Sequence, residues 1–213
     1  MNKENMPAVL GVGNALIDII SVLENDLVLE KFGLPRGSMT LVDDELSKKI
    51  YSEVVNHKSE MSTGGSAANT MRSFAGIGGN GGYLGKIGND ELGIVFREAF
   101  EKQGIKTHLF FSEKETGRVM GLVSPDSERT MATYLGAAAD LRPENFSSDL
   151  LKGYEYCYIE GYLVFNHELI KTGVEVAKNA GLKVAIDLAS YNVVEANLSF
   201  LKQLIIDYVD IVF

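Results

Sequence analysis

Short runs of consecutive apolar residues alternate along this chain with longer segments in which apolar residues recur at helical spacing. A short continuous apolar run is typical of a strand buried on both faces, and a 3.6-residue recurrence is typical of one face of a helix. The predicted strands are 8–12, 83–87, 156–159, 184–187 and 209–213. The predicted helices are 27–32, 44–55, 66–75, 89–104, 167–179 and 200–208. This order predicts an α/β domain with a Rossmann-like, mostly parallel sheet and helices on both faces.

One region departs from the alternation of strands and helices. Residues 107–135 contain no good helical pattern, and three segments in it read as strands joined by polar turns, namely 107–111, 118–123 and 130–135. Segments 19–23 and 38–42 predict two more short strands. We expect these segments, inserted in a single domain spanning 1–213, to form a small antiparallel sheet that acts as a lid. An ordinary edge hairpin on the main sheet is the alternative.

Two polar motifs lie where a ligand would bind in such a fold. Gly11-Val12-Gly13 ends the first predicted strand, and Asn14 and Asp18 follow it. Ligands bind beyond the carboxyl ends of the strands in open α/β sheets. A carboxylate and an amide at this position can hydrogen-bond the adjacent hydroxyls of a polyol. Asp18 as the cap of a turn is the alternative.

The second motif is Gly64-Gly65-Ser66-Ala67-Ala68-Asn69-Thr70, which opens the predicted helix 66–75. Adjacent glycines let a ligand approach the backbone closely. The free N–H groups of a helix start favour anions and oxygen-rich groups. Tight packing of the helix against a strand is the alternative explanation for the glycines.

Composition narrows the functional classes. The chain has 213 residues and a formal net charge of −9, without a cluster of Lys and Arg, so we expect no nucleic-acid partner. The single cysteine, Cys157, lies in an apolar run, where a buried, unreactive thiol is expected. The sequence shows neither a signal peptide nor a membrane-spanning run, so we expect a cytoplasmic protein without membrane contact. Gly76-Ile77-Gly78-Gly79-Asn80-Gly81 matches a dinucleotide-binding pattern but follows a helix, which indicates a helix-to-strand turn instead.

The motifs together resemble the ribokinase-type (PfkB) carbohydrate and nucleoside kinases. The residues that carry the resemblance are Gly13-Asn14 with Asp18, Gly64-Gly65-x-x-x-Asn69, and Gly85-Lys86-Ile87-Gly88-x-Asp90-x-x-Gly93. Thr116-Gly117 and Leu135-Gly136-Ala137-Ala138 also resemble family positions, and the segment 13–18 is similar to adenosine-kinase-like members. The resemblance covers the whole chain. It implies an α/β body with a β-sheet lid and transfer of the γ-phosphoryl group of ATP, with Mg²⁺, to a sugar hydroxyl.

The resemblance also implies roles for individual residues. Those implied to bind or line the sugar site are Asn14, Asp18, Gly64, Gly65, Asn69 and Glu160. Met120 and Tyr134 are implied to pack on the substrate from the lid, and Arg129 is similar to a lid arginine that faces the transferred phosphate. Asp187 lies where family members place polar residues near the cofactor.

One departure from the family pattern limits the expected activity. The family's catalytic base belongs to a Gly-Ala-Gly-Asp motif that comes later than Phe213, and an Asn-x-x-Glu motif for Mg²⁺ also follows the strand 209–213. Phosphoryl transfer depends on these groups. We therefore expect the N-terminal, substrate-binding part of a kinase, itself inactive, with no metal site of its own and with ATP and Mg²⁺ held mainly elsewhere. A non-catalytic sugar-binding, nucleoside-binding or regulatory module is the alternative, and exposed lid edges are compatible with a homodimer.

Overall fold

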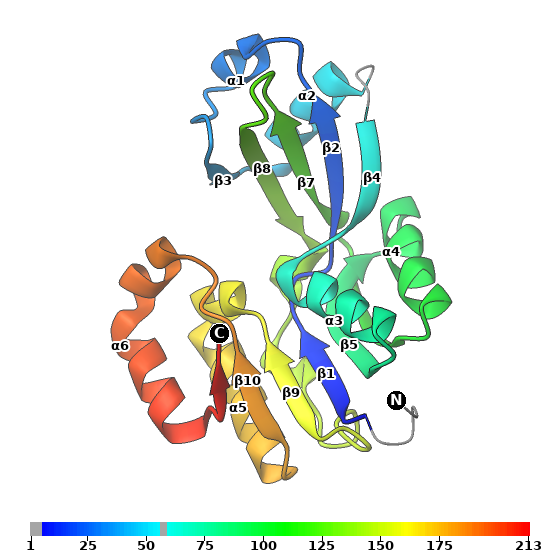
Figure 1. Cartoon of the computed structure of the whole chain (residues 1–213), viewed down its shortest axis with the longest axis vertical. Helices are drawn as coiled ribbons and strands as arrows, with labels where there is room; N and C mark the ends of the chain where they lie inside the picture. The colour runs from blue at the N-terminus through cyan, green and yellow to red at the C-terminus, as the bar shows by residue number, and fades with distance from the viewer. Residues whose placement is uncertain (1–5, 56–58) are drawn as a thin grey trace.

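The computed structural model describes residues 6–55 and 59–213, and they form two sheets joined at one corner (Figure 1). The larger, sheet A, has the strand order β11-β10-β9-β1-β5-β6, with every neighbouring pair parallel. Its strands are β1 (Ala8–Val12), β5 (Asn80–Gly88), β6 (Lys106–Ser112), β9 (Tyr156–Ile159), β10 (Lys183–Ile186) and β11 (Ile211–Val212). This is the predicted parallel sheet.

Helices cover both faces of sheet A because successive side chains of each strand point to opposite sides. Leu10, Val12 and Cys157 pack with helices α5 (His167–Asn179) and α6 (Tyr191–Tyr208). On the other face, Tyr83 and Tyr158 pack with helices α3 (Ser66–Gly76) and α4 (Glu91–Lys102). The predicted layered α/β body is confirmed. Short 3₁₀ turns η2 (Ala137–Asp140), η3 (Pro143–Asn145) and η4 (Gly161–Phe165) complete it.

The second sheet, called the lid below, stands above the carboxyl end of sheet A in Figure 1. Its strand order is β3-β8-β7-β2-β4. The strands are β2 (Leu16–Val22), β3 (Met39–Leu41), β4 (Ser59–Gly64), β7 (Thr116–Val123) and β8 (Arg129–Gly136). Helices α1 (Leu27–Lys31) and α2 (Asp44–Val54) cover its outer face through Leu29, Ile50 and Val54. The opposite, inner face looks toward the body.

The structure corrects the expected composition of the lid. Segment 107–111 belongs to β6, which pairs with β5 at the edge of sheet A and not with the lid. The lid instead contains β4, whose sequence Ser-Glu-Met-Ser-Thr-Gly is too polar to predict a strand. The lid is also mixed and not antiparallel, since β2 pairs with β7 and β3 pairs with β8 in parallel.

Two boundaries differ in ways that bear on the site. Strand β2 begins at Leu16, so Asp18 lies inside a lid strand and not in a loop after β1. Helix α6 begins at Tyr191, well before the predicted 200–208, with a kink at Asn197. The Asn197 amide is buried and donates to the Val193 carbonyl (2.9 Å), so a polar residue interrupts the apolar pattern of a continuous helix.

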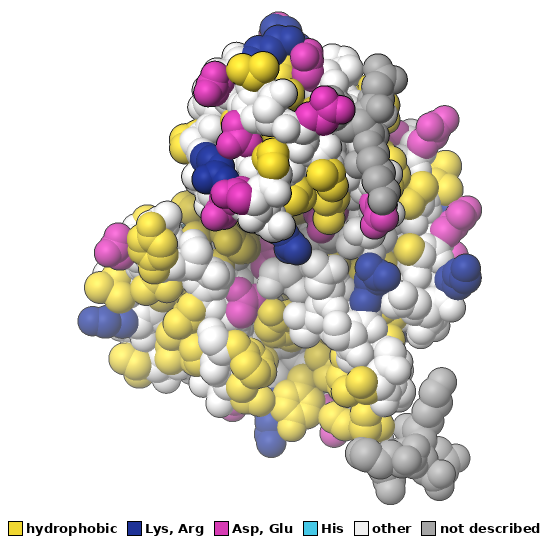
Figure 2. Space-filling model, turned by 45° about the horizontal axis from the view of Figure 1, so that its top comes forward, with side chains coloured by type: hydrophobic (Ala, Val, Ile, Leu, Met, Phe, Trp, Pro, Cys, Tyr) yellow, Lys and Arg dark blue, Asp and Glu magenta, His cyan; other side chains and the backbone are white. Residues whose placement is uncertain are grey.

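Surface properties add two findings. Hydrophobic side chains gather over the α6 side of the body, on the left of Figure 2. Among the residues of α6, Leu198 and Ile206 are exposed. Acidic and basic side chains are interspersed over the lid.

Within 6–55 and 59–213, the helices are all too short or too polar to traverse a lipid bilayer. Cys157 is fully buried, and burial raises the pKa of its thiol to about 12, as an inert core cysteine requires.

Candidate functional site

A cavity of about 340 Å³ lies between the inner face of the lid and the carboxyl end of sheet A. Its polar floor comes from the body and from the crossing point of the two sheets, and its wall comes from alternate residues of the lid strands. The floor residues are Asn14, Asp18, Gly65, Ser66, Asn69 and Glu160. Five of the six residues that sequence reasoning assigned to the sugar site therefore meet in one cavity. The sixth, Gly64, lies against one of them.

Asp18 is the half-buried acid of this floor. Among the described residues its carboxylate accepts no hydrogen bond. Burial raises the pKa of this group above its usual value. A desolvated carboxylate without a protein partner is costly unless a ligand supplies the missing donors. Asp18 is therefore a ready acceptor for ligand hydroxyls.

Gly64 makes room for this carboxylate. A β-carbon at Gly64 would overlap Asp18 Oδ1, so any larger residue would push the carboxylate from its place. The next residue, Gly65, has φ +99°, and its β-carbon would overlap the Asn14 carbonyl oxygen. The two glycines thus serve the close approach of other parts of the chain, which agrees with the packing alternative, and admission of a ligand to this backbone stays a prediction.

Glu160 is the most deeply buried charged group of the cavity, with a relative exposure of 2%. Its Oε1 accepts a hydrogen bond from Asn14 Nδ2 (2.7 Å), and its Oε2 accepts one from the Ala67 N–H (3.0 Å) in the first turn of α3. Burial raises the pKa of Glu160 to about 7, against the opposing effect of these two hydrogen bonds. Glu160 thereby joins β1, β9 and α3 beneath the cavity.

The lid wall is formed by strand residues of one parity, most of which are apolar. On β8 these are Arg129, Met131, Thr133 and Leu135, and on β7 they are Val119, Gly121 and Val123. Met120 and Tyr134 have the opposite parity, so they do not line the cavity. Met120 is fully buried in the outer core, and the Tyr134 ring lies 5.2 Å from the Arg118 guanidinium carbon.

Sequence reasoning missed most of the apolar wall. The missed residues are Leu16, Ile20, Met39, Leu41, Val119, Gly121, Val123, Met131, Thr133, Leu135, Tyr162 and Phe165. The signal that could have found many of them is period-two alternation from Asp18 along β2 and from Arg129 along β8. That rule selects Ile20 from Asp18 and Met131 from Arg129, and it rejects Met120 and Tyr134 once the strands are known.

The two residues predicted to contact the phosphate or the cofactor, Arg129 and Asp187, differ in their surroundings. Arg129 lines the cavity, and within the described part of the chain its guanidinium forms no ion pair. Asp187 lies beyond β10, outside the lining residues, where it accepts from Tyr158 Oη (2.6 Å), the Ala189 N–H (2.8 Å) and Ser66 Oγ (3.4 Å). The described residues contain no group of three or more metal-ligating side chains.

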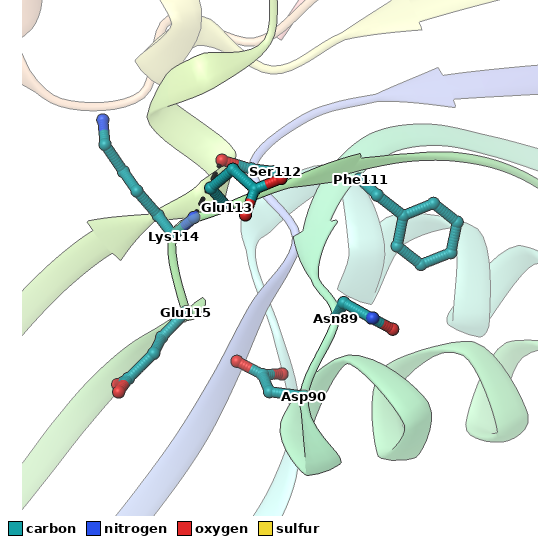
Figure 3. Close-up of a pocket in the computed structure, with 7 residues that line it drawn as sticks. All are labelled: Asn89, Asp90, Phe111, Ser112, Glu113, Lys114 and Glu115. Carbon is teal, nitrogen blue, oxygen red and sulfur yellow. Dashed lines mark hydrogen bonds between the residues drawn. The ribbon is translucent and has the colours of Figure 1, made fainter.

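A second hollow, of about 560 Å³, lies at the base of the lid (Figure 3). Phe111 and Asn89 form one side of it and the segment 113–115 the other, with Asp90 at the start of α4. The Asp90 carboxylate is fully used, because it accepts from the Gly93 N–H (2.8 Å), Thr116 Oγ1 (2.6 Å) and the Thr116 N–H (2.6 Å). These contacts make Asp90 part of the joint between body and lid, and the smaller cavity, where the predicted site residues meet, is the better candidate site.

Comparisons with known proteins agree with this architecture. The sequence model of the pfkB family carbohydrate kinases matches residues 37–213. Guanosine-inosine kinase of Escherichia coli K12 is 24% identical over 99% of this chain and 51% of its own length. Adenosine kinase of Dictyostelium discoideum is 29% identical over 73% of this chain and 47% of its own length. The chain thus spans about half the length of these curated relatives.

Solved structures extend the likeness to three dimensions. The crystal structure of adenosine kinase from Sinorhizobium meliloti superposes with a TM-score of 0.85 at 32% identity, over 98% of this chain and 64% of that one. Adenosine kinase from Schistosoma mansoni in complex with adenosine gives a TM-score of 0.83 at 27% identity, over 96% of this chain and 61% of that one. Sequence pattern, fold and site geometry agree, and the chain belongs to the pfkB family of carbohydrate kinases.

Proposed function

We propose that this chain carries the substrate site of an ATP-dependent nucleoside kinase, whose complete protein phosphorylates a ribose hydroxyl. The observation that carries the proposal is the Asp18 carboxylate, which lies unpartnered among the described residues in the cavity beside Asn14 and the start of α3. Two adjacent hydroxyls of a ribose supply the donors that this carboxylate lacks. The positive end of α3 favours the same oxygen-rich group.

The lid wall favours a nucleoside over a bare sugar. Met39, Leu41 and Met131 face the cavity from the lid, and Phe165 faces it from η4. A free pentose would leave this apolar surface in water, whereas a flat base would cover it, and methionine packs well against aromatic rings. The printed names of the relatives above, adenosine kinase and guanosine-inosine kinase, support the same substrate class.

Arg129 is proposed to meet the phosphoryl group during transfer. Its guanidinium lies at the cavity, where it can neutralise charge that develops on the transferred group. Asp187 is proposed to act on the cofactor side, next to the cavity residue Ser66. We further propose that the rest of the catalytic machinery, including the residues that bind ATP and Mg²⁺, belongs to the complete protein.

The proposal is tested by measuring ATP consumption by the full-length protein against adenosine, inosine, guanosine, ribose and fructose. We expect turnover with at least one nucleoside and a lower kcat/KM with either sugar. Asp18→Asn should lower kcat/KM about tenfold to a hundredfold, as expected for a lost hydrogen bond to a charged group. Glu98→Gln, an exposed acid on α4 that does not line the cavity, is the matched control and should leave kcat/KM unchanged. Equal turnover of ribose and nucleosides would contradict the assignment.

The alternative function is a non-catalytic sugar-binding, nucleoside-binding or regulatory module. It shares the cavity and differs only in turnover, so nucleoside binding without ATP consumption by the full-length protein would favour it. The cytoplasmic location and a homodimer through the lid edges stay predictions. Light scattering of the protein in solution tests the dimer, for which the edge strand β4 offers unpaired backbone groups.

A further inference from the structure

We propose that Glu160 is a positioning residue that sets which end of the Asn14 amide faces the ligand. As a carboxylate it holds Asn14 Nδ2 and leaves Oδ1 toward the cavity, and as a carboxylic acid it releases the amide to turn Nδ2 toward the cavity. The inference rests on the proposed function, because it concerns how the same cavity selects its ligand.

The geometry around Asn14 leaves one amide atom for the ligand. Asn14 lines the cavity with a relative exposure of 6%, and its Nδ2 donates to Glu160 Oε1 (2.7 Å). In the described part of the chain, Asn14 Oδ1 makes no hydrogen bond to the protein. This oxygen is therefore the acceptor that the Asn14 side chain offers to a ligand hydroxyl.

Glu160 cannot easily move away from Asn14. Its Oε2 accepts from the Ala67 N–H (3.0 Å), and a β-carbon at Gly13 would overlap Oε2, so the carboxylate fills a slot that only glycine leaves open. An ionised Glu160 has acceptors only, which forces the donor end of the Asn14 amide toward it. A protonated Glu160 has one O–H at Oε1, which can donate to Asn14 Oδ1 once the amide has rotated by half a turn.

The surroundings of Glu160 raise its pKa, so that its carboxylate takes up a proton near neutral pH. The carboxylate is 2% exposed, and in the described part of the chain no Lys or Arg forms an ion pair with it. Asp187 at the end of β10 adds like charge, and the neutral phenol of Tyr83 faces it from β5. Burial is the main reason that the pKa of Glu160 rises to about 7. Asp18 lies in the same cavity, so a test must distinguish the effect of its protonation from that of Glu160.

Isothermal titration of adenosine into the full-length protein from pH 6 to 8.5 tests the inference. The affinity should fall about fivefold to tenfold as the pH drops through 7, the cost of one mismatched hydrogen bond. Glu160→Gln should bind as weakly as the wild type does at low pH, without a step near 7, because its amide must donate to Asn14 Oδ1 while its carbonyl accepts from Ala67. A slope that remains in this variant comes from groups other than Glu160, such as Asp18.

A double variant reverses the donor and the acceptor. In N14D/E160Q the side-chain amide introduced at position 160 donates to the carboxylate introduced at position 14, which keeps its other oxygen toward the cavity. The affinity should therefore return toward the wild-type value at high pH, without a step near 7. Parallel pH profiles of wild type and E160Q, or weaker binding by N14D/E160Q than by E160Q, would overturn the inference.

A measurement without ligand separates this inference from the proposed function. In the NMR spectrum of the unliganded wild-type protein, the side-chain ¹⁵N signal of Asn14 should shift with the same midpoint as the ¹³C signal of the Glu160 carboxyl. An Asn14 signal that stays constant through the Glu160 titration would overturn the inference, even if every nucleoside binds. If no nucleoside binds but the two signals titrate together, the proposed function fails and the coupling of Glu160 to Asn14 stands.

Discussion

The carboxylate of Asp18 in β2 lies against the α-carbon of Gly64 in β4, at a point where a β-carbon would overlap Oδ1. The contact means that a methyl group at Gly64 should act on the ligand site through Asp18. We expect Gly64→Ala to weaken nucleoside binding about tenfold, by displacing the carboxylate that is proposed to accept the ligand hydroxyls. In a double-mutant cycle measured by titration calorimetry, Asp18→Asn and Gly64→Ala should be strongly non-additive. Additive losses would show that the two residues act independently.

The raised pKa of Asp18 predicts a pH-dependent cost to stability. Because burial raises this pKa in the folded protein, the folded state binds the Asp18 proton more tightly than the unfolded state does. Stability is therefore lost as the pH rises through the folded pKa. Asp18→Asn should melt at a higher temperature than the wild type at pH 7, and the gap should close below pH 4. A melting temperature below that of the wild type at pH 7 would contradict this sign.

Two buried tyrosines predict opposite responses to loss of a hydroxyl. Tyr83 is 0% exposed, and in the part of the chain that the structure describes its hydroxyl has no hydrogen-bond partner. Tyr158 Oη donates to Asp187 Oδ2 (2.6 Å). Denaturant titration should show Tyr83→Phe to be neutral or stabilising by up to about 1 kcal/mol, and Tyr158→Phe to be destabilising by about 1 kcal/mol. A large loss in Tyr83→Phe would reveal a partner, such as a buried water molecule.

The two faces of the lid predict different roles for two methionines. Met120 is 0% exposed in the outer core, whereas Met131 is 40% exposed on the cavity wall. Met120→Ala should lower the free energy of unfolding by about 2–5 kcal/mol. Met131→Ala should change it by less than about 1 kcal/mol but should weaken binding of a nucleoside more than binding of ribose. If Met120→Ala altered affinity at unchanged stability, the assignment of the faces would be reversed.

The body of this fold was largely predictable, because apolar runs of buried parallel strands differ clearly from helical spacing. The lid was less so. Strand β4 carries few apolar residues, and β6 was assigned to the wrong sheet because its sequence alone does not say which edge it joins. The polar floor followed from short motifs such as Asn14 and Asp18. The apolar wall did not, since whether Met120 or Met131 faces inward depends on strand register, which only the pairing of the strands fixes.

The central claim is that Asp18 and the inner face of the lid bind a nucleoside between them. A crystal structure of the full-length protein grown with saturating adenosine tests it most directly. We predict electron density in the 340 Å³ cavity, with ribose hydroxyls within hydrogen-bond distance of Asp18 and the base between Met131 and Phe165. Adenosine bound elsewhere, such as in the hollow lined by Asn89 and Phe111, with the cavity beside Asp18 empty, would contradict the claim.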